Sequence, residues 1–196
     1  MLIGITGRGG SGKSTLSKNI ISKNSSFIHL EVDTLIETKI FTSNKLVDDV
    51  NRFFTDKEYT LNDVILSYFD KSEKGKQIHK LFLNEVAAQV NLFISQNSDK
   101  NIIIDWFLLH EIFDLLSLDY KILTIASKKE RIERASKREK TDNINMFINV
   151  DNNFVEVDHS KIDLVINTEK KYNYDLILNN INKFDESSDK SKVFIL

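Results

Sequence analysis

A short stretch near the start of the chain carries the residue types that bind the phosphates of a nucleotide. Residues 7–14 read Gly-Arg-Gly-Gly-Ser-Gly-Lys-Ser, which matches the phosphate-loop pattern G-x-x-x-x-G-K-[ST] at every defined position. The apolar residues 2–6 predict a buried strand before the pattern, and the apolar spacing after it predicts a helix. Pattern and context together favour a binding site for ATP or GTP over a glycine-rich turn that only joins two elements.

The chemistry of a triphosphate explains why these residue types are needed. Glycines let successive backbone N–H groups point at phosphate oxygens. The first turn of the following helix adds unpaired N–H groups and the positive end of its dipole. We expect Lys13 to reach the β- and γ-phosphates and the Ser14 hydroxyl to ligate Mg²⁺. The expected nucleotide-binding residues are Gly10, Ser11, Gly12, Lys13, Ser14 and Thr15.

Two aspartates stand at the ends of predicted strands. Residues 27–32 precede Asp33, and residues 101–104 precede Asp105. Ligands of open α/β sheets bind outside the carboxyl ends of the strands, so both carboxylates are expected to face the phosphates. Asp105 has the form of the aspartate that meets the Mg²⁺ shell in phosphate-loop enzymes. Asp33 also suits a helix N-cap, and the two roles are compatible.

Three arginines share one face of a highly charged helix predicted over residues 129–140. Arg131, Arg134 and Arg138 are three and four positions apart. The chain is rich in lysine but has only five arginines, and planar guanidinium groups suit phosphate recognition. We therefore expect a lid at about residues 127–158 that closes over the transferring phosphates. The alternative is a solvated helix face with ion pairs four residues apart.

The rest of the chain predicts the elements that position these residues. Five strands alternating with helices predict an α/β fold, a three-layer P-loop sandwich with a five-stranded parallel sheet, helices on both faces and a helical lid. A long apolar stripe predicts a helix at about 75–96, with its stripe in the core. We expect one domain over 1–184, a helical acceptor-side insert at about 42–98 and a polar tail at 185–196. The strands are expected at 2–6, 27–32, 101–105, 120–126 and 163–167.

The composition excludes several classes of protein. The 196 residues suit one compact domain, and a net charge of −2 gives no reason to expect nucleic-acid binding. The absence of cysteine excludes disulfides and thiolate catalysis. No apolar run approaches the ~20 residues of a membrane span, and we expect no signal peptide because the first strand begins at once. These features predict a cytoplasmic protein and leave its oligomeric state open.

The order of the motifs resembles that of dephospho-CoA kinases, a family of the P-loop nucleoside/nucleotide kinase superfamily. The family's D-A-D strand end resembles residues 31–33, and its D-x-P-L-L-F-E segment resembles residues 105–111. Its lid pattern Q-x-x-R-x-x-x-R resembles the helix with the three arginines, and its A-D-x-V-I-x-N strand resembles residues 162–167. The resemblance covers most of residues 1–184. Only the phosphate loop is highly specific by itself.

This resemblance implies a reaction and a set of site residues. The reaction would be ATP- and Mg²⁺-dependent phosphorylation of the 3′-hydroxyl of dephospho-CoA, the last step of coenzyme A biosynthesis. Lys13 and Asp33 would be catalytic, with Asp33 orienting the acceptor hydroxyl. Arg134 and Arg138 would close from the lid and stabilise the transition state. Asp105 would support the metal shell or the acceptor, and His79 would lie on the substrate side, although a lone histidine is more often structural.

Several positions depart from the family pattern, and most of them are on the acceptor side. Lys80 and Phe107 stand where the family has proline, and Glu31 replaces the first acid of D-A-D. Asp63 follows Leu61-Asn62 where an arginine is usual, and the glutamine downstream of the lid is not evident in residues 148–153. Phosphoryl transfer is therefore better supported than the acceptor. The alternatives are a related kinase for a nucleoside or nucleotide and a diverged nucleotide-binding regulator. A GTPase is disfavoured because no guanine-reading N-K-x-D element is apparent.

Overall fold

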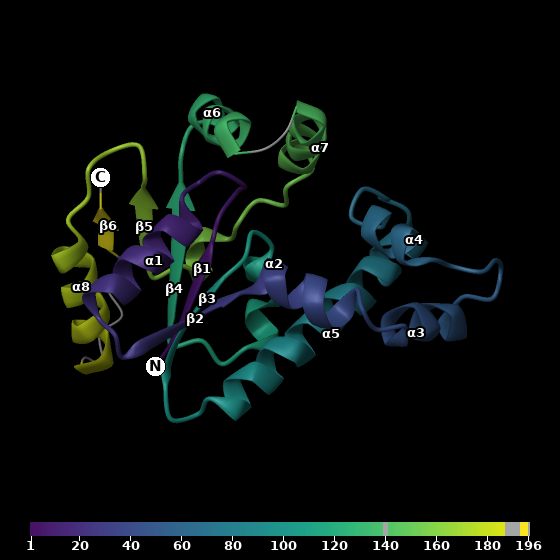
Figure 1. Cartoon of the computed structure of the whole chain (residues 1–196), viewed down its shortest axis with the longest axis horizontal. Coiled ribbons are helices and arrows are strands. Elements are labelled where there is room, and N and C mark those ends of the chain that lie inside the picture. The colour runs from purple at the N-terminus through teal and green to yellow at the C-terminus, as the bar shows by residue number, and fades with distance from the viewer. Residues whose placement is uncertain (139–140, 187–192, 196) are drawn as a thin grey trace. The chain divides into compact units, whose positions relative to one another are not determined.

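The computed structural model describes residues 1–138, 141–186 and 193–195. The chain divides into two compact units (Figure 1). The sheet unit comprises Met1–Leu30, Asp99–His110 and Ser117–Leu196, and the helical unit comprises Glu31–Ser98 and Glu111–Leu116. The phosphate loop and the predicted lid belong to the sheet unit, whereas the whole of the predicted acceptor-side insert belongs to the helical unit.

Six strands form one sheet in the order β2-β3-β1-β4-β5-β6. Strand β1 pairs with β3 and β4, β4 pairs with β5, and β5 pairs with β6, and all of these pairs are parallel. In this register Ile3 lies opposite Ile103, and Leu123 lies opposite Val165. The α/β fold and all five predicted strands are confirmed. A sixth strand, β6, lies inside the segment expected to be a polar tail, so the sheet is wider than predicted. The strands are β1 (Leu2–Thr6), β2 (Phe27–Glu31), β3 (Asn101–Asp105), β4 (Tyr120–Ile125), β5 (Leu164–Asn167) and β6 (Val193–Ile195).

Two helices cover one face of this sheet, α1 (Lys13–Lys23) and α8 (Tyr174–Glu186). Leu16 and Ile20 of α1 and Ile177 and Ile181 of α8 are almost fully buried in one apolar cluster. The cluster also contains isoleucines of the central strands, such as Ile5. Strands that are apolar on both faces are typical of a parallel sheet, because both of its faces are covered. This packing fixes the end of β1, from which the phosphate loop starts.

The predicted lid consists of two helices and an extended return. The charged helix is confirmed as α6 (Lys128–Arg138); residues 139–140 of the predicted range lie outside the described residues. The next segment contains both helix and loop: α7 (Thr141–Asn152) is followed by an irregular stretch and a short 3₁₀ helix, η3 (His159–Lys161). The chain then enters β5.

The helical unit is built around one long helix, α5 (Glu73–Gln96), which confirms the helix predicted at 75–96. Ser72 caps it by accepting a hydrogen bond from the Gly75 N–H at 3.0 Å. Its predicted apolar stripe is buried in part, with Ile78, Val86 and Val90 at most 4% exposed. The other elements are α2 (Val32–Leu35), the π-helix η1 (Ile36–Ile40), α3 (Lys45–Phe53), α4 (Leu61–Leu66) and the 3₁₀ helix η2 (Leu109–Leu115), whose last five residues belong to this unit.

A buried tyrosine of β4 makes the stability of the sheet sensitive to alkaline pH. Burial, with a contribution from the Asp163 charge, raises the pKa of Tyr120 from 10.0 to about 12. The folded state therefore favours the neutral phenol, and this stabilisation is complete below pH 10 and is lost as the pH rises towards about 12. We expect the urea midpoint to fall across this window and to fall less steeply in Tyr120→Phe. An equal slope in the two proteins would contradict this assignment.

Candidate functional site

The phosphate loop connects β1 to α1, and its glycines are required by its shape. Gly10 and Gly12 have φ angles of 71° and 94°. Residues with a Cβ rarely adopt positive φ angles of this size. A Cβ on Gly10 would lie 2.7 Å from the backbone oxygen of Arg131, and one on Gly12 would lie 3.1 Å from the Thr168 side chain. The loop is therefore packed closely between the start of α6 and the residue after β5.

Lys13, the first residue of α1, folds back over this loop. Its ammonium group donates hydrogen bonds to the backbone oxygens of Gly7 at 2.9 Å and Arg8 at 3.2 Å. These contacts hold a positive charge at the loop itself, next to the first turn of α1. A cation together with unpaired N–H groups at a helix start is the combination that stabilises a bound phosphate.

Ser14 and Asp105 bring two hard oxygen donors together. The Ser14 hydroxyl lies 3.5 Å from Asp105 Oδ1, and the Asp105 side chain is only 3% exposed. Hydroxyl and carboxylate oxygens are ligands that Mg²⁺ prefers, and Mg²⁺ usually takes its remaining ligands from phosphates and water. In the described ranges no group of three or more histidines and acidic residues could hold a metal by itself. The residues present therefore fit a Mg²⁺ ion that arrives with a nucleotide.

Two further residues contact Asp105, and neither was predicted from the sequence. Asp105 Oδ2 accepts a hydrogen bond from the Ser17 hydroxyl at 2.9 Å and lies 2.8 Å from His29 Nε2. Ser17 could have been found from its place one helical turn after Ser14, on the same face of α1. His29 lies in the middle of β2, and nothing in the local sequence marks it.

Arg134 of α6 contacts the phosphate loop. One of its terminal nitrogens donates to Thr168 Oγ1 at 2.8 Å and to the Gly10 backbone oxygen at 3.3 Å. The other donates to the Thr168 backbone oxygen at 3.0 Å, and Nε pairs with Glu130 at 2.8 Å. The guanidinium group is thus fixed against the loop backbone, while Arg138 is exposed at the end of α6.

Arg131 differs from the other two arginines of its helix face. It is buried, and its Nη2 lies 2.8 Å from both carboxylate oxygens of Asp151 of α7. It also donates to the Ala126 backbone oxygen at 2.6 Å. These contacts join α6 to α7, so Arg131 has a structural role within the lid. The three arginines therefore do not form one phosphate-facing row.

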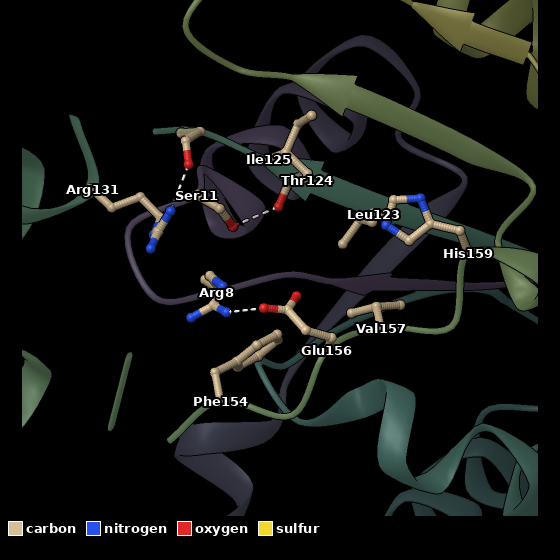
Figure 2. Close-up of a pocket in the computed structure, with 11 residues that line it drawn as sticks. Arg8, Ser11, Leu123, Thr124, Ile125, Arg131, Phe154, Glu156, Val157 and His159 are labelled. Carbon is tan, nitrogen blue, oxygen red and sulfur yellow. Dashed lines mark hydrogen bonds and ion pairs between the residues drawn. The ribbon is translucent and has the colours of Figure 1, made fainter. Parts of the chain in front are cut away.

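Arg8, a variable position of the phosphate-loop pattern, is held by the segment that follows α7. Figure 2 shows its guanidinium group beside Glu156 and over the ring of Phe154, whose centroid is 4.6 Å away. It also donates to the Asp151 backbone oxygen at 2.5 Å. A cavity of about 150 Å³ lies next to these contacts, and Figure 2 draws the residues that line it, including Ser11, Thr124, Arg131 and His159.

Asp33 and His79 belong to the helical unit. Asp33 is exposed in the first turn of α2, where Glu31 is the N-cap, so its interpretation as a helix N-cap is wrong. His79 lies on α5 with Nε2 3.7 Å from Glu111 Oε2, and its ring contacts Tyr68 and Phe82. The proposed roles of Asp33 and His79 towards an acceptor remain predictions.

A family model described as "AAA domain" matches residues 3–156, most of the chain. A search of curated protein sequences found no match. None of the described helices has both the length and the hydropathy that a membrane span needs.

Several solved structures share the fold. TT1252 from Thermus thermophilus aligns with a TM-score of 0.63 and 18% identity over 96% of this chain and 98% of its own. A sugar kinase from Janibacter sp. HTCC2649 aligns with a TM-score of 0.55 and 11% identity over 95% of both chains. Deoxyadenosine kinase from M. mycoides, solved with bound dATP, aligns with a TM-score of 0.50 and 19% identity over 93% of this chain and 99% of its own. The fold is thus that of P-loop kinases.

Proposed function

We propose that this chain, which belongs to the AAA domain family, is an ATP-dependent kinase that phosphorylates an alcohol group of a small molecule. The observation that carries the proposal is the arrangement around the phosphate loop. Lys13 folds over the loop, Ser14 faces Asp105, and the lid arginine Arg134 is hydrogen-bonded to the loop backbone. An enzyme that transfers phosphate between ATP and a free metabolite would work in the cytoplasm.

Each residue of this arrangement has a role in phosphoryl transfer. Residues 10–15 bind the phosphates through backbone N–H groups, and Lys13 balances the charge that develops between the β- and γ-phosphates. Ser14 and Asp105 would hold Mg²⁺, which neutralises phosphate charge when it is bound. Positioned cations act most strongly where water is excluded, so a lid that carries Arg134 and Arg138 would also limit wasteful hydrolysis of ATP.

The acceptor hydroxyl needs a residue that orients it and receives its proton. Asp33 is the second residue of α2, which follows β2, and it is exposed, so its carboxylate is accessible to a substrate. A carboxylate within hydrogen-bond reach of a hydroxyl can act as a general base. His79, paired with Glu111, is the candidate for acceptor binding in the helical unit.

We propose dephospho-CoA as the acceptor, on the strength of the ordered motifs that resemble its kinases. The second candidate is a nucleoside, favoured by the structural similarity to a deoxyadenosine kinase. The test is to incubate the chain with Mg·ATP and a mixture of dephospho-CoA, deoxyadenosine, deoxycytidine and ribose, and to identify the phosphorylated product by mass spectrometry. Phosphorylated dephospho-CoA supports the first candidate. A phosphorylated nucleoside overturns it in favour of the second, and no product favours a nucleotide-binding regulator.

Arg138 provides a test of the lid. We expect Arg138→Ala to lower kcat on the order of 10²-fold, because a positioned cation near the transferring phosphate would be lost. The affinity for ATP should change little, since Lys13 and the loop backbone remain. Lys137→Ala, which removes an exposed charge from the neighbouring position of the same helix, is the matched control. Equal kcat values for the two variants would remove Arg138 from the mechanism.

A further inference from the structure

The two oxygens of Asp105 have different surroundings. Oδ1 faces the Ser14 hydroxyl at 3.5 Å, a separation too long for a strong hydrogen bond. Oδ2 has close partners instead, Ser17 Oγ at 2.9 Å and His29 Nε2 at 2.8 Å. One oxygen of the carboxylate is therefore held by the protein, and the other is directed to the residue that is expected to ligate Mg²⁺.

The two donors on Oδ2 are not equivalent. A hydroxyl group has one proton, and the Ser17 hydroxyl also lies 3.1 Å from the Lys13 backbone oxygen, so it cannot donate to both acceptors at once. The imidazole of His29 has no such competition among the recorded contacts of the described residues. Because an ionised carboxylate only accepts hydrogen bonds, the short contact requires that Nε2 carry the proton. His29 is thus the constant donor on this oxygen.

We propose that His29 is a positioning residue for the metal site: its Nε2–H fixes the rotation of the Asp105 carboxylate so that Oδ1 stays directed to Ser14 and the Mg²⁺ shell. This inference rests on the proposed binding of Mg·nucleotide at the phosphate loop. His29 comes from β2, the neighbour of β3 in the sheet, so two strands rather than a loop hold the pair in place. The His29 and Asp105 side chains are 18% and 3% exposed, which limits competition from water.

Residues that hydrogen-bond to a metal ligand tune the metal site without touching the ion. Removal of such a partner typically costs ~10–100-fold in metal affinity or activity. A purely structural His29 would instead affect the stability of the fold and leave the metal affinity unchanged. The two roles therefore predict different measurements.

The test uses Mn²⁺ as a paramagnetic substitute for Mg²⁺, since both prefer oxygen ligands in octahedral geometry. The full chain is saturated with ADP, Mn²⁺ is added, and the loss of the free Mn²⁺ signal in electron paramagnetic resonance gives its Kd. His29→Leu has no donor, whereas His29→Gln keeps an N–H at the end of its side chain. ADP affinity is measured separately in EDTA, so that nucleotide and metal binding are resolved.

We expect His29→Leu to raise the Kd for Mn²⁺ by ~10-fold or more, with unchanged ADP affinity in EDTA. His29→Gln should recover most of the affinity, and Ser17→Ala should have a smaller effect than His29→Leu. If His29→Leu does not fold, His29→Asn, whose shorter amide cannot span the same distance, takes its place beside His29→Gln. An unchanged Kd for Mn²⁺ in a folded variant without the donor would overturn the role of His29. A wild-type chain that binds no ADP would instead overturn the proposed function.

Discussion

Lys13→Ala is expected to lower kcat by about 10³-fold, because it removes the ammonium group that is hydrogen-bonded to two backbone carbonyls of the phosphate loop. The loss should appear mainly in kcat, since the charge on the transferred group and the leaving phosphate is redistributed in the transition state. The measurement is the steady-state rate of ADP release at saturating Mg·ATP and acceptor.

The matched control for this variant is Lys18→Ala. Lys18 lies on the same helix and is exposed, so its replacement changes the net charge equally without touching the loop. We expect Lys18→Ala to retain wild-type activity. Comparable losses in the two variants would mean that net charge, rather than the position of the Lys13 ammonium group, determines the rate.

Asp151→Ala is expected to produce the largest loss of stability. Arg131 is 6% exposed and Asp151 5% exposed, and Nη2 of Arg131 lies 2.8 Å from both carboxylate oxygens of Asp151. Removal of one partner leaves a buried guanidinium group without its counter-charge, which costs about 3–5 kcal/mol in free energy of unfolding. Urea unfolding monitored by circular dichroism measures the change. The double replacement with Arg131→Met should recover much of the loss, because no uncompensated buried charge remains.

An exposed ion pair of the same lid helix provides the comparison for Asp151. Glu133 and Lys137 are 2.8 Å apart, but both side chains are more than half exposed. Glu133→Ala should leave the urea midpoint unchanged within error, because solvent and salt screen such pairs. If Asp151→Ala shifted the midpoint no further than Glu133→Ala, the buried pair would not contribute to stability as the structure implies.

The phosphate loop and the strand ends could be predicted from the sequence because their signals are local. The loop pattern occupies eight consecutive residues, and Asp105 follows an unbroken apolar run. The α/β fold followed from the alternation of strands and helices, and it is confirmed. The width of the sheet could not be predicted in the same way. Three apolar residues after a polar stretch do not indicate whether they pair, and here they pair with β5.

The roles of the arginines show where local pattern stops being informative. Helical spacing correctly placed Arg131 and Arg134 on one face, but their partners come from residues that are distant in sequence. Asp151 neutralises Arg131, and Thr168 fixes Arg134. His29 was missed for the same reason, because its partner lies on another strand. Sequence periodicity identifies a face of an element and does not identify the residues that pack against it.

The most direct test of phosphoryl transfer is a coupled ADP-release assay with Mg·ATP, with and without dephospho-CoA, on the wild-type chain and Lys13→Ala. We expect slow release without acceptor, strong stimulation by dephospho-CoA, and loss of that stimulation in Lys13→Ala. Release that dephospho-CoA does not change would contradict the proposed acceptor. If deoxyadenosine, deoxycytidine and ribose also failed to stimulate it, the assignment of the chain as a small-molecule kinase would be contradicted as well.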